Sequence, residues 1–352
     1  MLNTEAKKRM IPDFFENINS KEEWEAKKNE IRDLFLKEEY GFLPEKITPE
    51  ITIEKQYINF AGKGEWESVF FTFKKGEKSH TVRTELVLPK GKTDVGVFLY
   101  IDFESGVPNK YIPMEEILDN GFGVFTFCYQ NVTSDDNDFT NGLCGLFCDE
   151  NGKCSFGKIS IWSYMASICM DYLKTRDEVG KVAIAGHSRL GKTALLTSAL
   201  DDRFDLTCVN NSGCCGASVS RGKIDANENI VKITDTFPFW FCENFFKYRD
   251  NEDALHFDQH MLIGLVAPRP IMIGGAIDDV WADNEGQLLS CYLASKIWTL
   301  YGKKGLICEN RLPLVNDRFL EGDVCFHLRE GTHFFSRYDW NVYMQKFKEF
   351  LQ

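Results

Sequence analysis

The pattern of hydrophobic and polar positions changes twice along the chain. Residues 20–23, Ser-Lys-Glu-Glu, form a capping box, which predicts a helix that runs to about Tyr40 and stops at Gly41. The next segment has the pattern of strands, because β-branched and aromatic residues are interrupted there by glycines. These strands are predicted over residues 51–60, 66–73 and 82–88.

Strands and helices alternate through the rest of the chain. Short apolar runs predict strands over 95–101, 123–129, 182–185, 206–209, 271–274 and 324–328. The segments between them predict helices over 114–120, 159–174, 193–200, 283–301 and 338–351. Such alternation is typical of an α/β fold, with a mainly parallel sheet covered by helices on both faces.

This pattern also suggests how the chain is divided. We predict that residues 1–80, a helix and antiparallel strands, pack on a catalytic α/β domain formed by residues 81–352. Two long stretches, 130–158 and 212–257, are predicted to be insertions near the mouth of a site.

Composition narrows the class of protein. A chain of 352 residues with 43% hydrophobic positions can bury a large core. The net charge of -12 argues against a nucleic-acid partner, because phosphate binding needs clustered Lys and Arg. No apolar run is long enough to span a membrane, and residues 1–15 lack the apolar centre of a signal peptide. We therefore expect a cytoplasmic protein with neither a nucleic-acid nor a membrane partner.

The 12 cysteines are interpreted as reduced thiols, because no secretion signal accompanies them. The adjacent pair Cys214-Cys215 and the scatter of the others do not resemble a disulfide framework. The spacing of Cys144, Cys148 and Cys154 matches no common zinc pattern, so a loop of small apolar residues is favoured over a metal site.

Residues 186–193, GHSRLGKT, satisfy two motifs that imply different chemistries. One is the phosphate-binding P-loop, G-x-x-x-x-G-K-T. A P-loop needs small residues, so that backbone N–H groups can wrap a phosphate, whereas the interior here is His-Ser-Arg-Leu. It also needs an acid for Mg²⁺ after another strand; the strand 206–209 supplies only Asn210 and Asn211, but Asp278 and Asp279 follow the strand 271–274. The P-loop therefore stays open as an alternative.

The other motif is a nucleophile elbow, G-x-S-x-x-G, with Ser188 between a strand and a helix. An elbow requires an acid after a later strand and then a histidine after the last strand. Asp279 and His333 occupy those places in that order. A histidine activates the serine hydroxyl, and a carboxylate orients the histidine. We predict Ser188, Asp279 and His333 as a catalytic triad, with Asp278 as the rival acid.

Oxyanion donors are predicted at two places. One is the backbone N–H of Arg189 at the start of the helix, and the other lies near Asp102 and Phe103, after the strand 95–101. Each triad member also has a simpler interpretation: a helix cap for Ser188, a turn for the aspartates, a surface loop for His333. Their order on successive elements favours the triad. His256, His260 and His327 compete for the role of base, and the last two lie inside a predicted helix and strand.

With these residues identified, the chain resembles the glucuronoyl esterases, carbohydrate esterase family fifteen, and nearby bacterial proteins labelled acetylxylan esterases. Residues 186–192 are similar to the family's G-C-S-R-x-G-K elbow, with His187 in place of Cys. Further similar segments are Asn211-Ser212-Gly213 with Gly216, Phe239-Trp240-Phe241, Asp258-Gln259-His260, Ala267-Pro268-Arg269-Pro270 and Asp279-Val280-Trp281-Ala282-Asp283. The resemblance implies an α/β-hydrolase fold and hydrolysis of esters between a xylan glucuronic acid and a lignin alcohol, without metal or cofactor.

The resemblance also implies roles for single residues. Ser188 is the expected nucleophile and His333 the base, and the Arg189 side chain is expected to assist the oxyanion hole. Lys192 is expected to bond sugar hydroxyls, and Trp281, together with Trp240, to line the substrate pocket. An ammonium one helical turn after Ser188 faces the same mouth, and an indole suits a sugar ring.

One departure from the family concerns the acid. Many members carry a catalytic Glu after the strand that follows the elbow, where this chain has Asn211. The acid is therefore expected at Asp279. A small, imported carbohydrate ester is the expected substrate, either a glucuronate ester or an acetylated oligosaccharide. A P-loop nucleotide-binding protein and an inactive sugar-binding hydrolase fold are the alternatives from other classes.

Overall fold

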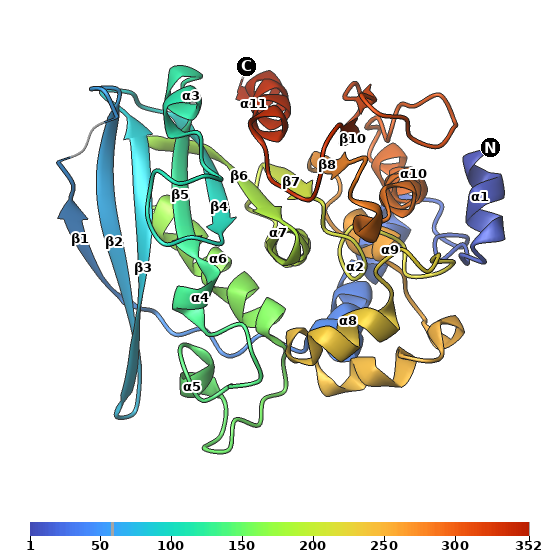
Figure 1. Cartoon of the computed structure of the whole chain (residues 1–352), viewed down its shortest axis with the longest axis horizontal. Coiled ribbons are helices and arrows are strands. Elements are labelled where there is room, and N and C mark those ends of the chain that lie inside the picture. Colours follow the sequence, from blue (N-terminus) through green and yellow to red (C-terminus); the bar gives the residue numbers. More distant parts are fainter. Residues whose placement is uncertain (58–59, 352) are drawn as a thin grey trace.

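A ten-stranded sheet forms the centre of the protein, as seen in a computed structural model that describes residues 1–57 and 60–351 (Figure 1). The strand order is β1-β2-β3-β5-β4-β6-β7-β8-β10-β9. From β5 to β10 in this order the strands are parallel, whereas β1, β2, β3 and β9 pair antiparallel. The strands are β1 (Glu50–Lys55), β2 (Gly64–Lys75), β3 (Lys78–Pro89), β4 (Val95–Asp102), β5 (Gly123–Cys128), β6 (Val179–His187), β7 (Leu206–Asn210), β8 (Ile271–Ala276), β9 (Arg318–Phe319) and β10 (Val324–Arg329).

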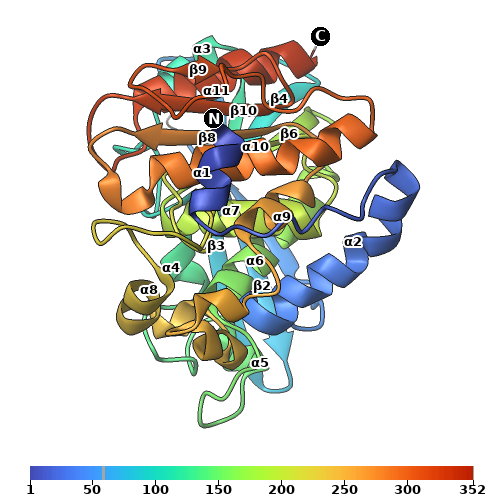
Figure 2. The ribbon, with the colours of Figure 1, turned by 90° about the vertical axis from the view of Figure 1, so that its right-hand side faces the viewer.

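Helices cover both faces of this sheet (Figures 1 and 2). The α-helices are α1 (Leu2–Lys8), α2 (Lys21–Phe35), α3 (Met114–Asp119), α4 (Tyr129–Val132), α5 (Cys144–Phe147), α6 (Lys158–Leu173), α7 (Arg189–Leu200), α8 (Ile230–Thr236), α9 (Gln259–Gly264), α10 (Asn284–Leu300) and α11 (Arg337–Leu351). A π-helix, η1 (Leu36–Tyr40), follows α2, and four 3₁₀ turns are η2 (Pro238–Trp240), η3 (Glu243–Tyr248), η4 (Glu252–Ala254) and η5 (Val280–Ala282).

The side chains of β4 show how the two cores form. Phe98 and Tyr100 belong to a cluster that α3 and α11 cover, whereas Val97 and Leu99 belong to the larger cluster under α6, α7, α9 and α10. Successive strand residues point to opposite faces, and here both faces are buried. The predicted α/β-hydrolase architecture is confirmed.

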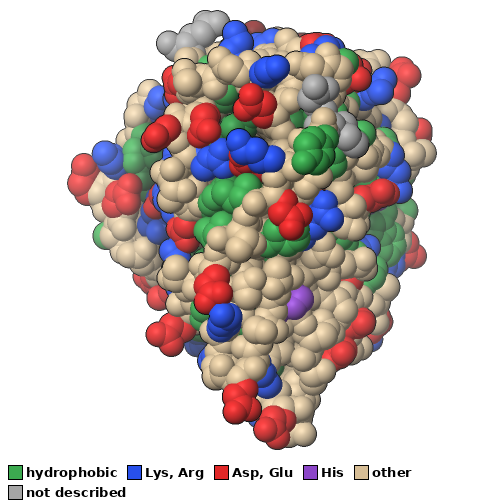
Figure 3. Space-filling view, turned by 90° about the vertical axis from the view of Figure 1, so that its left-hand side faces the viewer, with side chains coloured by type: hydrophobic (Ala, Val, Ile, Leu, Met, Phe, Trp, Pro, Cys, Tyr) green, Lys and Arg blue, Asp and Glu red, His purple; other side chains and the backbone are tan. Residues whose placement is uncertain are grey.

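The edge strand β1 differs from the central strands because all its residues are exposed. The face of the molecule on this side carries interspersed acidic and basic side chains with apolar ones between them (Figure 3). Charges along an edge strand discourage pairing with another chain. The predicted strand 51–60 was too long, since β1 ends at Lys55; residues 58–59 lie outside the described part of the chain.

The predicted boundary at residue 81 falls inside β3, which pairs with β2 on one side and β5 on the other. The N-terminal strands therefore extend the parallel part of the sheet, because backbone hydrogen bonds join them strand to strand.

The N-terminal helix confirms the capping box. Ser20 Oγ accepts from the Glu23 N–H at 3.1 Å, and the Glu23 carboxylate accepts from the Asn19 N–H at 2.7 Å. The helical turns end at Tyr40, and Gly41 follows with a φ of 86°. A Cβ on Gly41 would lie 2.2 Å from the Phe156 Cα, so only glycine fits this stop.

The cysteines depart from the prediction that all are reduced. Cys148 and Cys154 form a disulfide in the 130–158 insertion, and the other ten cysteines are free. Among the residues that the structure describes, no cluster of three His, Cys, Asp or Glu side chains could hold a metal ion. Within residues 1–57 and 60–351, every helix is too short or too polar to cross a membrane.

The α2 helix gives a test of how the N-terminal segment contributes to stability. Trp24 is fully buried and packs edge-on against Phe15 at 5.7 Å. We expect Trp24→Ala to lower the free energy of unfolding by about 3–5 kcal/mol, because it leaves a cavity. Urea unfolding measures this, with the exposed Lys27→Ala as control; equal stability of the two variants would show that the segment is not part of the cooperative core.

Candidate active site

The turn between β6 and α7 places Ser188 at the carboxyl edge of the sheet. Ser188 has φ 58° and ψ -128°, a conformation that residues with side chains rarely adopt. A Cβ on Gly186 would lie 2.1 Å from the Leu190 carbonyl oxygen, so the turn can close only with glycine at 186. The geometry is that of a nucleophile elbow.

The P-loop alternative fails on the same geometry. The helix begins at Arg189, four residues earlier than predicted, so no open loop remains between strand and helix to wrap a phosphate. The Lys192 side chain is 3% exposed, and its ammonium donates to Ser212 O (2.5 Å), Cys214 O (2.6 Å) and Glu228 Oε2 (2.8 Å). These three partners use all its N–H donors.

Asp279 and His333 meet beside this turn. His333 follows β10 and Asp279 follows β8, and the His333 Nδ1 lies 2.6 Å from Asp279 Oδ2. Parallel neighbours end at the same edge of a sheet, which brings two loops 54 residues apart into contact. Asp278, the rival acid, is exposed, and the carboxylate that contacts His333 is that of Asp279.

Asn211 supports Asp279 from the end of β7. Its Nδ2 donates to Asp279 Oδ2 at 2.5 Å. Burial acts to raise the pKa of Asp279, but the hydrogen bonds from His333 and Asn211 outweigh it and hold that pKa below its ordinary value. Asp279 is thus an anion at neutral pH, and Asn211 is its donor rather than an acid.

His187 is a site residue that the sequence reasoning missed. Its ring lies 4.4 Å from the ring of His333, and its Nδ1 lies 2.7 Å from Asn210 Oδ1. Burial, followed by the neighbouring His333, lowers the pKa of His187 to about 3, so this ring is neutral at neutral pH. The only signal in the sequence was its place beside Ser188, where the family elbow has Cys.

The other candidate histidines have structural surroundings. His260 is buried in α9 against Phe14 and Phe15, and His327 bonds the Asp339 carboxylate at 2.8 Å. His256 is exposed at the edge of another pocket, away from Ser188.

Arg189 and the expected substrate residues surround the mouth of the turn. The Arg189 guanidinium lies over the Trp240 ring at 4.7 Å and the Phe103 ring at 5.9 Å. Trp281 is 41% exposed at the rim. Glu228, which no motif had indicated, is buried and bonds Lys192. Glu228, Phe237 and Trp240 come from the 212–257 stretch, in keeping with its predicted place at the mouth of a site.

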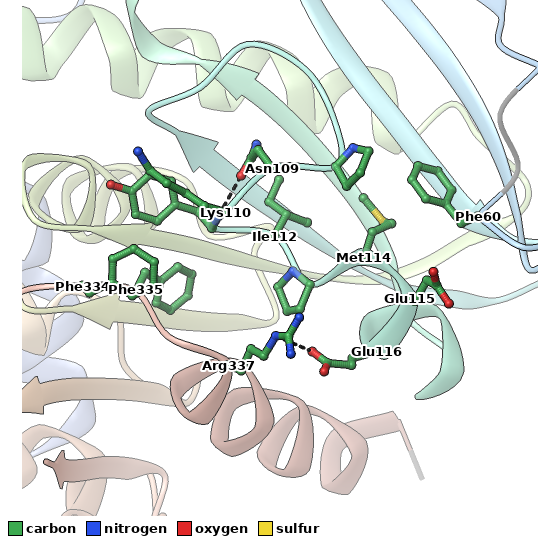
Figure 4. A pocket seen from close by; sticks show the side chains of 13 residues that line it. Phe60, Asn109, Lys110, Ile112, Met114, Glu115, Glu116, Phe334, Phe335 and Arg337 are labelled. Atoms are coloured by element: carbon green, nitrogen blue, oxygen red, sulfur yellow. Dashed lines mark hydrogen bonds and ion pairs between the residues drawn. The ribbon is translucent and has the colours of Figure 1, made fainter. Parts of the chain in front are cut away.

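These residues line one cavity of about 420 Å³, which holds Ser188, Arg189, Lys192, Asn211, Ser212, Gly213, Glu228, Phe237, Trp240, Asp279, Trp281, Ala282 and His333. A larger pocket, about 510 Å³, lies on the other side of the His333 loop. Phe334 and Phe335 line it opposite Phe60, and the exposed pair of Arg337 and Glu116 lies at its side (Figure 4). The larger pocket holds none of the triad candidates, so the smaller one is the candidate active site.

The loop that carries His333 is held by a buried pair. Arg329 donates to the Thr332 carbonyl at 3.3 Å and to that of Phe334, and its Nε bonds Asp339 at 2.8 Å. Asp339 also accepts from the N–H and hydroxyl of Ser336. His333 is thereby held between Thr332 and Phe334, whose carbonyls both accept from Arg329.

Comparison with known proteins shows clear relatives. A family profile described as "Glucuronyl esterase, fungi" matches residues 71–302. Carbohydrate esterase MZ0003, from an unknown prokaryotic organism, is 32% identical over 93% of this chain and 85% of its own length. A 4-O-methyl-glucuronoyl methylesterase from Schizophyllum commune is 28% identical over 75% of this chain and 65% of its own length. The solved structure of a glucuronoyl esterase from Solibacter usitatus, 29% identical, matches 94% of each chain with a TM-score of 0.86.

The buried ion pair of Arg329 and Asp339 predicts that the stability of the protein depends on pH. Burial acts to raise the pKa of Asp339, but the bonds from His327, Arg329 and Ser336 lower it from 3.8 to about 2. The resulting stability is present above pH 3.8 and is lost as pH falls towards 2. Between pH 5 and pH 3, we expect the stability advantage of wild type over Asp339→Asn to shrink by about 1 kcal/mol in denaturant unfolding. An advantage that stayed flat over this range would contradict this.

Proposed function

This chain belongs to the glucuronoyl esterase family and is a carboxylic ester hydrolase, and we propose that it cleaves uronate esters of carbohydrates with the triad Ser188, His333 and Asp279. The observation that carries the proposal is the 2.6 Å contact between His333 Nδ1 and Asp279, in the cavity that Ser188 also lines. The strained elbow supports it, because strain of this kind is retained where it serves a function.

In the first half of the proposed reaction, His333 Nε2 takes the proton of the Ser188 hydroxyl as the oxygen attacks the ester carbonyl. Asp279 holds the Nδ1–H of His333 and stabilises the imidazolium that forms. The tetrahedral intermediate then expels the alcohol, which takes the proton from His333, and the acyl group stays on Ser188. A water molecule repeats these steps and releases the carboxylic acid.

The oxyanion of the intermediate needs donors that are already in place. We assign this role to the Arg189 backbone N–H, at the first residue of α7, and to the region of Phe103 after β4. The Arg189 side chain adds a positive charge beside the same cavity.

The sugar-binding side of the proposal rests on Trp281, Trp240 and the Lys192–Glu228 pair. The two indoles offer flat apolar surfaces for a sugar ring. Because the donors of Lys192 are all used within the protein, we assign the contact with sugar hydroxyls to Glu228, with Lys192 holding that carboxylate at 2.8 Å. This changes the role expected for Lys192 from direct contact to support.

Acetylated oligosaccharides remain the alternative substrate within the same chemistry. The cytoplasmic location predicted from the sequence stays a prediction. The Cys148–Cys154 disulfide counts against it, because such bonds persist in oxidising compartments.

Two esters distinguish these alternatives. We expect a benzyl ester of glucuronic acid to be turned over far better than p-nitrophenyl acetate, because the acetyl group reaches neither Glu228 nor Trp281. Ser188→Ala should abolish both activities in steady-state assays. Turnover of acetate alone would identify an acetyl esterase, and turnover that survives Ser188→Ala would refute the proposed triad.

The acid is tested by a matched pair of amide variants. We expect Asp279→Asn to lower kcat by about 10⁴-fold, because the amide favours the wrong tautomer of His333. Asp278→Asn removes the same charge one residue away and should stay near wild type. If the two results were reversed, the acid would be Asp278.

A further inference from the structure

We propose that Asp135 is a positioning residue that holds the Arg189 guanidinium at the oxyanion side of the cavity. This inference rests on the proposed function, since it assigns a partner to a residue of that site. Asp135 lies in the 130–158 insertion and outside every motif that indicated the active site.

The contacts of Asp135 are directed at Arg189 and its surroundings. Its side chain is 7% exposed, and Oδ2 forms an ion pair with Arg189 Nη1. The same oxygen accepts from the Tyr129 hydroxyl at 3.0 Å, and Oδ1 accepts from Trp240 Nε1 at 2.8 Å. Because three donors hold the Asp135 carboxylate in one orientation, the Arg189 guanidinium that pairs with it is held as well.

Aromatic rings restrict the guanidinium on its other sides. Its centre lies 4.7 Å from the Trp240 ring, 5.1 Å from Phe237 and 5.9 Å from Phe103. Trp240 and Phe237 stack at 3.9 Å with an interplanar angle of 3°. These nearby rings leave the guanidinium little room to move, and the carboxylate fixes the direction of its Nη1.

The loop that carries Asp135 is itself rigid. Asn141 bonds Ser134 at its N–H and hydroxyl, at 2.9 and 2.7 Å. The buried Lys158 at the start of α6 donates to Thr133 Oγ1 at 3.0 Å and to the Asp138 carbonyl at 2.6 Å. These bonds bracket Asp135 on both sides, so its carboxylate is placed by the insertion and not by Arg189 alone.

Other donors of the Arg189 guanidinium remain free for a ligand. Among the described residues only Nη1 forms a hydrogen bond, to Asp135, while the side chain is 23% exposed and lines the cavity with Ser188. The geometry points to a guanidinium that Asp135 holds by Nη1 while another N–H serves the negative oxygen of the intermediate.

The test is a double-mutant cycle with the glucuronate benzyl ester as substrate. Loss of one oxyanion donor costs about 10²–10³-fold in kcat, so imperfect placement should cost about 10–100-fold. We expect Asp135→Asn to lower kcat by that factor with KM within about threefold, since the interaction forms in the transition state. In an Arg189→Ala background the same change should cost less than about twofold.

Controls separate positioning from folding. Asp136→Asn removes the neighbouring exposed charge and should behave as wild type, and Asp135→Glu should recover part of the lost kcat. Tyr129→Phe keeps the ring but removes the hydroxyl that donates to Asp135, so it supplies a second, milder variant if Asp135→Asn unfolds early.

Two outcomes would overturn the inference: Asp135→Asn within about twofold of wild type, or an equal loss with and without Arg189, which indicates a structural role. Both leave the proposed function standing, because that function is decided by Ser188-dependent turnover of the uronate ester in the wild-type protein.

Discussion

The positive φ of Ser188 is the constraint on which the site depends. A residue with a side chain keeps this conformation only when its surroundings hold it there. Here β6 ends in the middle of a buried sheet, Gly186 lets the Leu190 carbonyl approach, and α7 starts at the next residue. The turn places Ser188 and Arg189, the first residue of α7, on the wall of the same cavity.

The proposed catalytic acid lies where two neighbouring parallel strands end. Asn211 at the end of β7 and Asp279 after β8 belong to neighbouring strands, and their side chains meet at 2.5 Å. Either strand end is therefore within reach of His333. In this chain the carboxylate comes from the β8 loop, and the amide at 211 stabilises it as an anion.

The insertions build what the sheet alone does not provide. The 212–257 stretch contributes Glu228, Phe237 and Trp240, and the 130–158 stretch brings Asp135 to Arg189. These segments contain little regular structure. The 130–158 stretch is nevertheless held by the buried Lys158, by the hydrogen bonds of Asn141 and by the Cys148–Cys154 disulfide. Around the proposed triad, the 212–257 stretch lines the cavity itself, whereas the 130–158 stretch contacts Arg189 of its wall.

By itself, the sequence determined the fold class, favoured the elbow over a P-loop and predicted the order of the proposed triad, because these follow from local patterns: strand and helix periods, two glycines, and the succession of elements. It left the P-loop open as an alternative, because the two motifs differ in where the helix starts, and it left Asp278 as a rival of Asp279, because the two are adjacent. Only the tertiary structure showed that Asp279 contacts His333 and that Lys192 donates to Glu228. It also showed that His187, Glu228 and Asp135 lie at the site. These contacts join residues far apart in the chain. The periodicity of a single sequence predicts helices and strands, but it does not show which distant side chains meet.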